Sequence, residues 1–318
     1  MFIYILSNII DLLYINNSIT LKMKKIIYKI FVKIISNFLV GLNKVNIIFF
    51  SKYDFLSKIN DNIEEHKYCL KEVNKKKLNF FIPTDIAHTR VQSLFAKEPE
   101  TINWIDNFKD ESIFWDIGAN IGIYSIYAAS KFKNLKIISF EPSTSNTRTL
   151  SRNISINNFD NQIKIFPIAL CEKENILSKF SENKFCEGWS GSTFDNNTDF
   201  EGKKLIKKNI KNNYQILGTS INQLLKQKVL EIPNYIKIDV DGIEHLILKG
   251  AKNFLKHKKI REILVEINPR HKLQSRLIEI ILKKNGFKKV IATNKRLFRD
   301  SNYKLTENDM LNTIFRKV

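Results

Sequence analysis

The sequence predicts an α/β fold: a seven-stranded, mostly parallel sheet with helices on both faces, preceded by a helical extension. From residue 113 onward, short apolar runs alternate with segments of helical periodicity, which is typical of βαβ units. Several of these runs end on acidic residues, as strands do when their carboxyl ends meet at a ligand-binding edge. At 318 residues the chain can form one large domain and an extension.

We place the extension at residues 1–79 and the α/β domain at residues 80–318. The expected order begins with a short strand at 80–83 and helices at 90–96 and 99–108. Periodicity then predicts strands at 113–117, 135–140, 163–167, 235–239, 261–267, 286–292 and 311–317. It predicts helices between them at 121–132, 145–157, 219–227, 243–255 and 273–284. We expect the last strand to pair antiparallel and close the sheet.

The extension contains a predicted basic amphipathic helix. Between Met23 and Leu42, apolar residues recur at helical spacing, and the same stretch holds Lys24, Lys25, Lys29 and Lys33. Such a helix can lie on an anionic membrane surface. The alternative is a helix packed on the α/β domain or on a partner subunit. No uncharged run in the first 21 residues approaches the about 18 residues of a membrane-spanning helix.

The chain is strongly basic, with a formal net charge of +20. This charge raises the hypothesis of a nucleic-acid partner. However, 43 of the 52 basic residues are Lys, whereas a nucleic-acid reader would use more Arg for bidentate contacts. The charge therefore favours loose affinity for anionic surfaces, and a nucleic-acid partner is not expected. Three cysteines without paired spacing, Cys69, Cys171 and Cys186, indicate a reducing, cytoplasmic compartment.

Residues 171–218 interrupt the alternation of strands and helices. An insertion of this length in a compact domain is typical of a lid, a substrate loop or a disordered stretch. Its place between the third and fourth strands brings it near the carboxyl edge of the sheet, where ligands bind. A solvated excursion without a role is the alternative.

The clearest motif is Trp115–Gly122, WDIGANIG. A strand ends on Asp116 and turns at once through Gly118, Asn120 and Gly122 into a helix, which forms a cradle for a small ligand. Asn120 stands where a dinucleotide-binding turn has its second glycine, and Asn tolerates left-handed backbone. An acid at the head of the loop suits a ligand with a positive amino group. Alone, the turn also fits an ordinary strand–turn–helix unit.

Three further strands also end on acids. Glu141 follows the strand at 135–140 and lies 25 residues after Asp116, near the interval expected of a carboxylate that binds ribose hydroxyls. The segment Ile236–Glu244, IKIDVDGIE, puts Asp239 at the end of a strand and returns Asp241 to the same side. For Glu244 we favour a stabilising charge in the first turn of the next helix. Glu266 ends the following strand.

Together these segments resemble the FkbM family of methyltransferases. The resemblance covers roughly residues 80–318. Besides the motifs above, it is carried by FEP at 140–142, Leu150, Asn153, Asn157, Lys249-Gly250-Ala251 and Val265-Glu266-Ile267. Asp241 departs from the family pattern, in which Glu is more frequent. The resemblance implies a Rossmann-like class I methyltransferase fold.

The resemblance also implies a methyl donor, S-adenosylmethionine, and an acceptor hydroxyl on a sugar, glycan or related secondary metabolite. In the implied donor site, Asp116 lies near the donor ammonium, directly or through water, and Glu141 holds the ribose. Gly118 and Gly122 let the backbone approach the methionine moiety, and Asn120 shapes the turn between them.

We expect the acceptor side to use Asp239 first, as a base or to orient the hydroxyl. Glu266 at the same edge and His271 on the following loop, a residue type that titrates near neutrality, are further catalytic candidates. Asp239, Asp241 and Glu266 could together hold a divalent cation through oxygen ligands, but a metal-free site is favoured.

Three alternatives remain at this stage. An RNA or other nucleic-acid methyltransferase fits the charge, but the chain has no [DNS]-P-P-[YF] or Pro-Cys dipeptide for base methylation. An NAD-dependent oxidoreductase fits the fold, but Asn120 and the missing G-x-G-x-x-G oppose it. A non-enzymatic membrane-surface scaffold fits the basic helix alone. The sequence predicts neither the acceptor's identity nor the oligomeric state.

Overall fold

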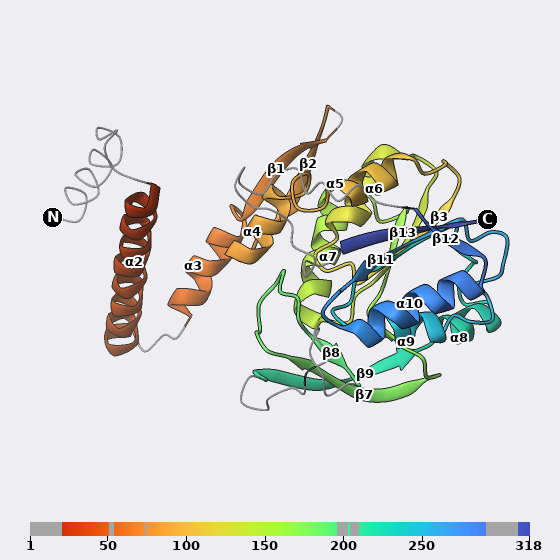
Figure 1. Cartoon of the computed structure of the whole chain (residues 1–318). Coiled ribbons are helices and arrows are strands. Elements are labelled where there is room, and N and C mark those ends of the chain that lie inside the picture. Colours follow the sequence, from red (N-terminus) through yellow and green to blue (C-terminus); the bar gives the residue numbers. More distant parts are fainter. Residues whose placement is uncertain (1–20, 51–53, 74, 196–202, 204–209, 291–310) are drawn as a thin grey trace. The chain divides into compact units, whose positions relative to one another are not determined.

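The computed structural model describes residues 21–50, 54–73, 75–195, 203, 210–290 and 311–318 (Figure 1). The chain forms two compact units, Met1–His66 and Lys67–Val318. The second unit thus begins earlier than the expected boundary at residue 80. The reason is a hairpin of β1 (Tyr68–Val73) and β2 (Lys76–Phe81), which the polar, Lys-rich sequence did not predict.

The hairpin is fastened to α7 (Thr144–Ile156) by two asparagines. Oδ1 of Asn153 accepts a hydrogen bond from the Phe81 backbone N–H at 2.6 Å, and Oδ1 of Asn157 accepts one from the Asn79 N–H at 3.0 Å. A backbone group buried without a partner is costly, so these amides replace a neighbouring strand. Two residues that carried the family resemblance therefore have a structural task.

The first unit contains α2 (Leu21–Phe50) and α3 (Phe55–Glu64). The basic helix expected at 23–42 is therefore longer at both ends. Within the described residues, its segment Ile26–Phe50 is long and apolar enough to cross a membrane, judged by length and composition alone. The expectation about the first 21 residues falls, except for Leu21, outside the described chain.

The second unit is built on a seven-stranded sheet with the order β12-β13-β11-β10-β3-β4-β5. All pairs are parallel except those of β13, which runs antiparallel to β11 and β12, as expected. The strands are β3 (Ile113–Ile117), β4 (Lys136–Phe140), β5 (Ile163–Phe166), β10 (Tyr235–Ile238), β11 (Glu262–Ile267), β12 (Phe287–Val290) and β13 (Leu311–Lys317). Residues 291 and 292 of the expected 286–292 strand lie outside the described chain.

Two apolar cores lie on opposite faces of this sheet. One face is covered by α4 (Asp85–Gln92), α5 (Pro99–Asp106), α6 (Ile123–Lys131) and α7. The other is covered by α8 (Ile221–Lys226), α9 (Glu244–Lys249) and α10 (Lys272–Lys284). Figure 1 shows α8, α9 and α10 close together on their face. The predicted fold class is confirmed, although α9 is shorter than the expected helix at 243–255.

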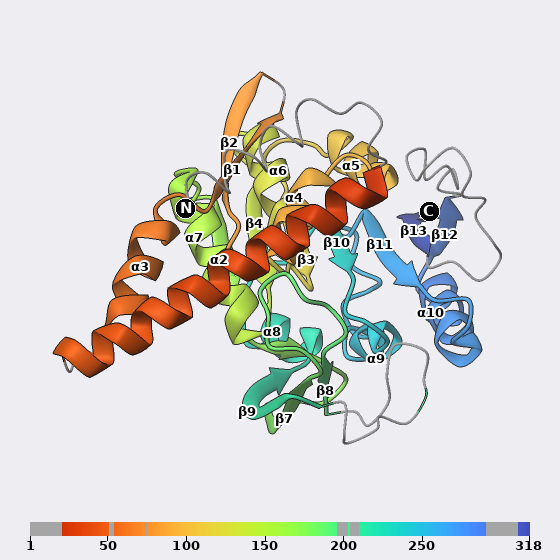
Figure 2. The ribbon, with the colours of Figure 1, turned by 90° about the vertical axis from the view of Figure 1, so that its left-hand side faces the viewer.

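The insertion at 171–218 forms a small sheet of its own with the order β6-β9-β7-β8. Its strands are β6 (Ala169–Leu170), β7 (Ile176–Glu182), β8 (Thr193–Phe194) and β9 (Asn212–Thr219). Figures 1 and 2 both show β7, β8 and β9 grouped apart from the main sheet. Residues 196–202 and 204–209 lie outside the described chain.

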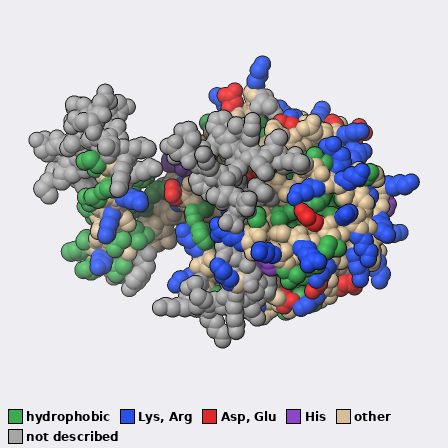
Figure 3. All heavy atoms as spheres, in the orientation of Figure 1, with side chains coloured by type: hydrophobic (Ala, Val, Ile, Leu, Met, Phe, Trp, Pro, Cys, Tyr) green, Lys and Arg blue, Asp and Glu red, His purple; other side chains and the backbone are tan. Residues whose placement is uncertain are grey.

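Charge is distributed rather than concentrated on the face seen in Figure 3. Lys and Arg side chains are scattered over it, with acidic and apolar side chains between them. A groove-shaped basic stripe of the kind that tracks a nucleic-acid backbone is not visible on that face.

Candidate active site

The turn after β3 is built around Gly118 and Asn120. Gly118 has φ +81°, and a Cβ placed on it would lie 1.9 Å from the carbonyl oxygen of Asp239. Only glycine fits there, because both the backbone conformation and the approach of β10 exclude a side chain. Asn120 has φ 53°, the left-handed conformation expected of it. The Gly118 and Ala119 N–H groups both donate to the Phe140 carbonyl, which ties the turn to β4.

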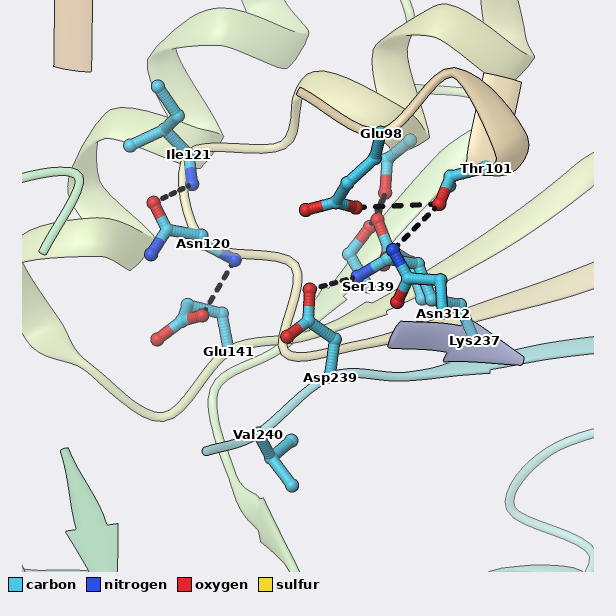
Figure 4. A network of polar contacts seen from close by, with 12 residues as sticks. Glu98, Thr101, Asn120, Ile121, Ser139, Glu141, Lys237, Asp239, Val240 and Asn312 are labelled. Carbon is cyan, nitrogen blue, oxygen red and sulfur yellow. Dashed lines mark hydrogen bonds and ion pairs between the residues drawn. The ribbon is translucent and has the colours of Figure 1, made fainter. Parts of the chain in front are cut away.

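Glu141, at the end of β4, faces this turn (Figure 4). One carboxylate oxygen accepts the Asn120 N–H at 2.7 Å and the other accepts the Ser143 N–H at 2.9 Å. The side chain is buried, and burial raises the pKa of Glu141 to about 7 against these hydrogen bonds. Each carboxylate oxygen has a second lone pair, so Glu141 can still accept hydrogen bonds from a ligand.

A cavity of about 350 Å³ opens at the carboxyl edge of the sheet. Two groups of polar residues line it: the turn and Glu141 on one side, and charged side chains on the other. The charged and hydroxyl-bearing residues of the second side are Arg90, Lys97, Glu98, Tyr124, Lys237, Asp239, Asp241, Glu266 and Arg270. A smaller, mostly apolar cavity adjoins it, because both cavities are lined by Gly118, Pro142 and Val240.

Part of the insertion lines this cavity, and its role as a lid stays a prediction. Trp189 and Ser190 line it, and the Trp189 carbonyl accepts hydrogen bonds from the side-chain amides of Asn120, at 2.9 Å, and Asn146, at 3.1 Å. Arg90 donates from Nε to the Gly188 carbonyl. The loop between β7 and β8 is therefore fastened to the cradle itself.

Asp116 does not line the cavity. Of the other predicted donor-site residues, Gly118, Asn120 and Gly122 form the turn, and Glu141 faces that turn. Asp116 is fully buried, its Oδ2 accepts a hydrogen bond from Ser125 Oγ at 2.6 Å, and its Oδ1 lies 3.7 Å from Lys237 Nζ. The reason is strand register: Asp116 on β3 stands opposite Lys237 on β10. The expected approach of Asp116 to the donor ammonium is therefore replaced by a buried ion pair.

Asp239 and Glu266 both line the cavity, but their electrostatics differ. Burial opposes ionisation of Asp239, yet the Lys237 ammonium at 2.8 Å and Lys97 together hold its pKa at about 2. Burial and the neighbouring Asp239 and Asp241 raise the pKa of Glu266 well above its usual range. Asp239 is thus a permanent carboxylate, whereas Glu266 binds a proton far more readily.

Asp241 also lines the cavity, and Glu244 lies beneath it. Oδ2 of Asp241 accepts the Gly191 N–H at 2.7 Å. Oε1 of Glu244 accepts the N–H groups of Val240 and Gly242, which fixes the turn into α9. Burial raises the pKa of Glu244 to about 7, so the charge expected in the first turn of the helix is disfavoured. Within the described residues, no three His, Cys, Asp or Glu side chains are grouped to hold a metal ion. The set Asp239, Asp241 and Glu266 is not such a group.

His271 is not brought to the cavity, so the geometry does not support its predicted catalytic role. It caps α10, where Nδ1 accepts the Gln274 N–H at 3.4 Å, and its ring lies 6.0 Å from that of His245. The sequence predicted that His271 follows β11 on a loop, but a loop position does not determine in which direction a side chain points.

Five charged residues of the cavity were missed: Arg90, Lys97, Glu98, Lys237 and Arg270. Lys97 Nζ lies 2.8 Å from Glu98 Oε1, and although burial opposes it, this ammonium lowers the pKa of Glu98. The first three precede β3 and reach the site only through tertiary packing. Lys237 did have a signal, since strand alternation places it on the same side as Asp239.

Comparison with known proteins agrees with these features. Residues 116–289, more than half of the chain, match the model of the methyltransferase FkbM domain. The methyltransferase sdnD of Sordaria araneosa is 26% identical over 58% of this chain and 76% of its own length. The hexuronic acid methyltransferase AglP of Haloferax volcanii is 22% identical over 56% of this chain and 65% of its own length.

Among solved structures, the FkbM methyltransferase of Methylobacillus flagellatus aligns with a TM-score of 0.40 and 13% identity over 83% of this chain and 59% of its own. Of the curated relatives it matches, the chain spans as little as 8% of the length. The family match decides the enzyme class: it excludes the oxidoreductase alternative and the scaffold without a catalytic domain. Methyltransferases of this fold generally use S-adenosylmethionine. The chain belongs to the FkbM family of methyltransferases.

Proposed function

We propose that this protein transfers a methyl group from S-adenosylmethionine to a hydroxyl group of a sugar or glycan. The observation that carries the proposal is one cavity that joins the Gly118–Gly122 turn and Glu141 to two cavity-facing carboxylates, Asp239 and Glu266. The first set suits a nucleoside with a ribose, and the second suits a hydroxyl acceptor.

The residues present fit this donor group by group. Glu141 retains acceptor capacity for the two ribose hydroxyls. The adjoining apolar cavity, lined by Phe140, Pro142 and Val240 among others, suits a purine ring. The methionine end of the donor carries an ammonium and a carboxylate. The cavity offers a charged partner for each: Glu98 for the ammonium and Arg90 for the carboxylate. When bound, the donor supplies an electrophilic methyl group.

The acceptor side assigns separate tasks to the two carboxylates. We assign Glu266 as the proton acceptor, because burial and neighbouring acids raise its pKa well above the usual range. Asp239, whose pKa is held at about 2, is too weak a base and instead orients the hydroxyl. During methyl transfer, Glu266 would accept the proton that the acceptor hydroxyl loses, while Asp239 would hold that hydroxyl in place. Of the two roles expected for Asp239, base or orienting group, this assignment keeps the second.

Two considerations support a sugar acceptor. The relative AglP is named a hexuronic acid methyltransferase, and it matches 56% of this chain. The acceptor wall also combines acidic side chains with Arg270 and Lys97, a mixture that suits hydroxyl-rich ligands better than apolar ones.

We further propose that α2 docks the enzyme on an anionic membrane surface. At 100° per residue, Lys29, Lys33 and Lys44 fall within an arc of about 60°. All three are exposed, and exposed apolar side chains lie both opposite them, as Phe38 does, and among them, as Ile26 and Val40 do. A helix with clustered lysines and exposed apolar side chains can lie in the plane of the interface.

Calorimetry with S-adenosylmethionine and a transfer assay on a panel of sugars and uronic acids test the proposed function. We expect micromolar donor binding, a loss of at least tenfold in affinity for Glu141→Ala, and methyl transfer to a sugar hydroxyl. The exposed Glu231, paired with Lys136, provides a matched control as Glu231→Ala. Unchanged donor affinity in Glu141→Ala would contradict the donor site, and transfer only to RNA would contradict the acceptor class.

A further inference from the structure

Lys237 is a lysine buried in the central strand of the sheet. Its side chain is 1% exposed, and the Nζ lies 2.8 Å from Oδ2 of Asp239 and 3.7 Å from Oδ1 of Asp116. Tyr124 covers it, with its ring centre 5.1 Å from the Nζ. A buried ammonium is costly unless it is paired, so two carboxylates on neighbouring strands have to be present for this lysine to stay charged.

Asp116 lies on the side of Lys237 away from the cavity, and hydrogen bonds hold it in place. Ser125 Oγ on α6 donates to its Oδ2 at 2.6 Å and lies 2.8 Å from Ser139 Oγ on β4. The other oxygen, Oδ1, is buried without a hydrogen bond in the described chain, so Lys237 supplies its compensating charge. Asp116 therefore fixes Lys237, and Lys237 in turn contacts the one carboxylate of the three residues that reaches the cavity.

We propose that Lys237 is a positioning residue, which holds the Asp239 carboxylate ionised and turned into the cavity while Asp116 serves as its counter-charge (Figure 4). The Asp239 side chain is 23% exposed, against 1% for Lys237 and 0% for Asp116, so Asp239 is the more accessible of the two members of the row that line the cavity. Because Lys237 occupies Oδ2, the Oδ1 oxygen is left for the ligand. The proposal rests on the proposed function only for what that ligand is.

Glu266 provides an internal comparison. It ends β11, the strand next to β10, and lines the same cavity, but no ion pair with a lysine is found for it in the described chain. Burial and the surrounding acids raise its pKa well above the usual range, whereas Lys237 and Lys97 keep the pKa of buried Asp239 at about 2. The pKa values of these two carboxylates at one sheet edge are thus shifted in opposite directions. The contact with Lys237 is the structural difference between them.

Charged groups face Asp239 from every element packed around it. The cationic ones are Lys237 on β10, Lys97 before α5 and Arg90 on α4, and the acidic ones are Asp116, Glu98, Asp241 and Glu266. Four acids surround the carboxylate, and Lys237 is the only cation among these within 3 Å of it. Without Lys237, the remaining acids and burial favour a protonated, neutral Asp239.

The test uses the full-length protein and three variants: Lys237→Arg, Lys237→Met, and Lys237→Met combined with Asp116→Asn. The Lys237→Met substitution alone would leave the buried Asp116 carboxylate without a compensating charge. The double variant removes this carboxylate together with the lysine and so leaves the net charge of the interior unchanged, even where the single variant fails to fold. Carboxyl-carbon NMR of aspartate-labelled protein, without any ligand, follows the ionisation of Asp239 directly.

In wild type and Lys237→Arg we expect no change in the Asp239 signal between about pH 5 and about pH 8. In the double variant we expect it to titrate within that range. Because the pKa of Glu141 is itself raised to about 7, donor affinity is compared between variants at each pH. Calorimetry should show an affinity in the double variant that falls at least fivefold further than in wild type at the acidic end. A stable double variant whose Asp239 signal stays flat with pH and whose donor affinity follows that of wild type would overturn the proposal.

Failure of the proposed function would appear differently. If wild type binds no S-adenosylmethionine while the Asp239 signal titrates only in the double variant, the donor assignment is wrong and the positioning role of Lys237 holds. Because the NMR measurement needs no ligand, the two outcomes are separable.

Discussion

The backbone N–H of Gly191 donates a hydrogen bond to Oδ2 of Asp241 at 2.7 Å. Gly191 belongs to the loop of the insertion, and Asp241 to the turn that follows the strand of Asp239. This bond therefore joins the cover of the cavity to its catalytic edge. Burial and the nearby Asp239 raise the pKa of Asp241, against the hydrogen bond from Gly191. The cover is consequently held by a carboxylate that itself lines the cavity.

Removing that anchor should loosen the cover. We expect Asp241→Ala to weaken donor binding by roughly ten- to hundredfold, since a hydrogen bond to a charged group contributes about 1.5–3 kcal/mol. Calorimetry measures the affinity, and limited proteolysis of the 183–192 loop measures the opening. Asp241→Asn, which keeps an oxygen to accept the bond, should lose much less. Equal losses in both variants would show that charge rather than the anchor matters.

The tight approach at Gly118 predicts a steric effect. Gly118→Ala should abolish donor binding and destabilise the fold by more than 2 kcal/mol (about 1–2 from the left-handed backbone alone), because its Cβ would meet the Asp239 carbonyl oxygen at 1.9 Å.

Gly191→Ala is the matched control for this substitution. Gly191 also has a positive φ, of +89°, but the nearest atom to an added Cβ is 3.7 Å away. Gly191→Ala should therefore destabilise the fold only by the strain of a left-handed backbone, about 1–2 kcal/mol. Urea denaturation compares the two variants, and equal destabilisation would disprove the role of the close approach.

Glu244 predicts a pH-dependent stability. Its burial raises its pKa from the ordinary 4.5 to about 7. The stabilisation is complete below the ordinary pKa and is lost as the pH rises through about 7, because the folded protein keeps a proton that the unfolded chain releases. This amounts to up to roughly 3 kcal/mol. Urea denaturation should show stability falling across this interval less steeply in Glu244→Gln, whatever its absolute value; identical slopes would refute the assignment.

The proposed proton acceptor can be separated from donor binding. Glu266→Gln should lower kcat by about 10²- to 10⁴-fold and leave donor affinity within a few fold, because the loss affects the transfer step. Activity of wild type should rise with pH, since burial and neighbouring acids raise the pKa of Glu266 and it accepts a proton only once ionised. A flat pH profile together with full activity of Glu266→Gln would exclude this role.

Vesicle sedimentation tests the membrane role of α2. A variant with Lys29, Lys33 and Lys44 changed to Glu should lose at least tenfold in binding to phosphatidylglycerol-containing vesicles, since each lysine near such a surface contributes about 1 kcal/mol. The control changes the exposed Lys256, Lys258 and Lys259 of the second unit to Glu, the same change in net charge. Equal losses in the two triple variants, or wild-type binding unaffected by lipid charge, would contradict interfacial docking.

Local patterns predicted the sheet well, and the site only in part. The strand–turn–helix at Asp116–Gly122 and the acid at Glu141 were visible because neighbouring residues in sequence make them. The partner of Asp116 was not visible, because Lys237 reaches it through the register of two strands that lie 121 positions apart in sequence. Arg90 and Glu98 were missed for a related reason: their segment precedes the domain core and joins the cavity only by folding back.

Other errors came from side-chain direction and from polar composition. The sequence places His271 close to Glu266, but the first turn of α10 directs its ring to the Gln274 N–H. The β1–β2 hairpin contains Lys71, Lys76 and Lys77, so its residues did not read as strands. Pairing between the strands and the amides of α7 stabilise it instead.

The row of Asp116, Lys237 and Asp239 has two negative charges and one positive. Under the proposed chemistry, methyl transfer turns a cationic sulfonium into a neutral thioether. The unbalanced negative charge at Asp239 then attracts the spent donor less strongly than the fresh one. Release of the demethylated donor, the last step of turnover, would therefore be faster and product inhibition weaker, because the positive charge that attracted the donor has left with the methyl group.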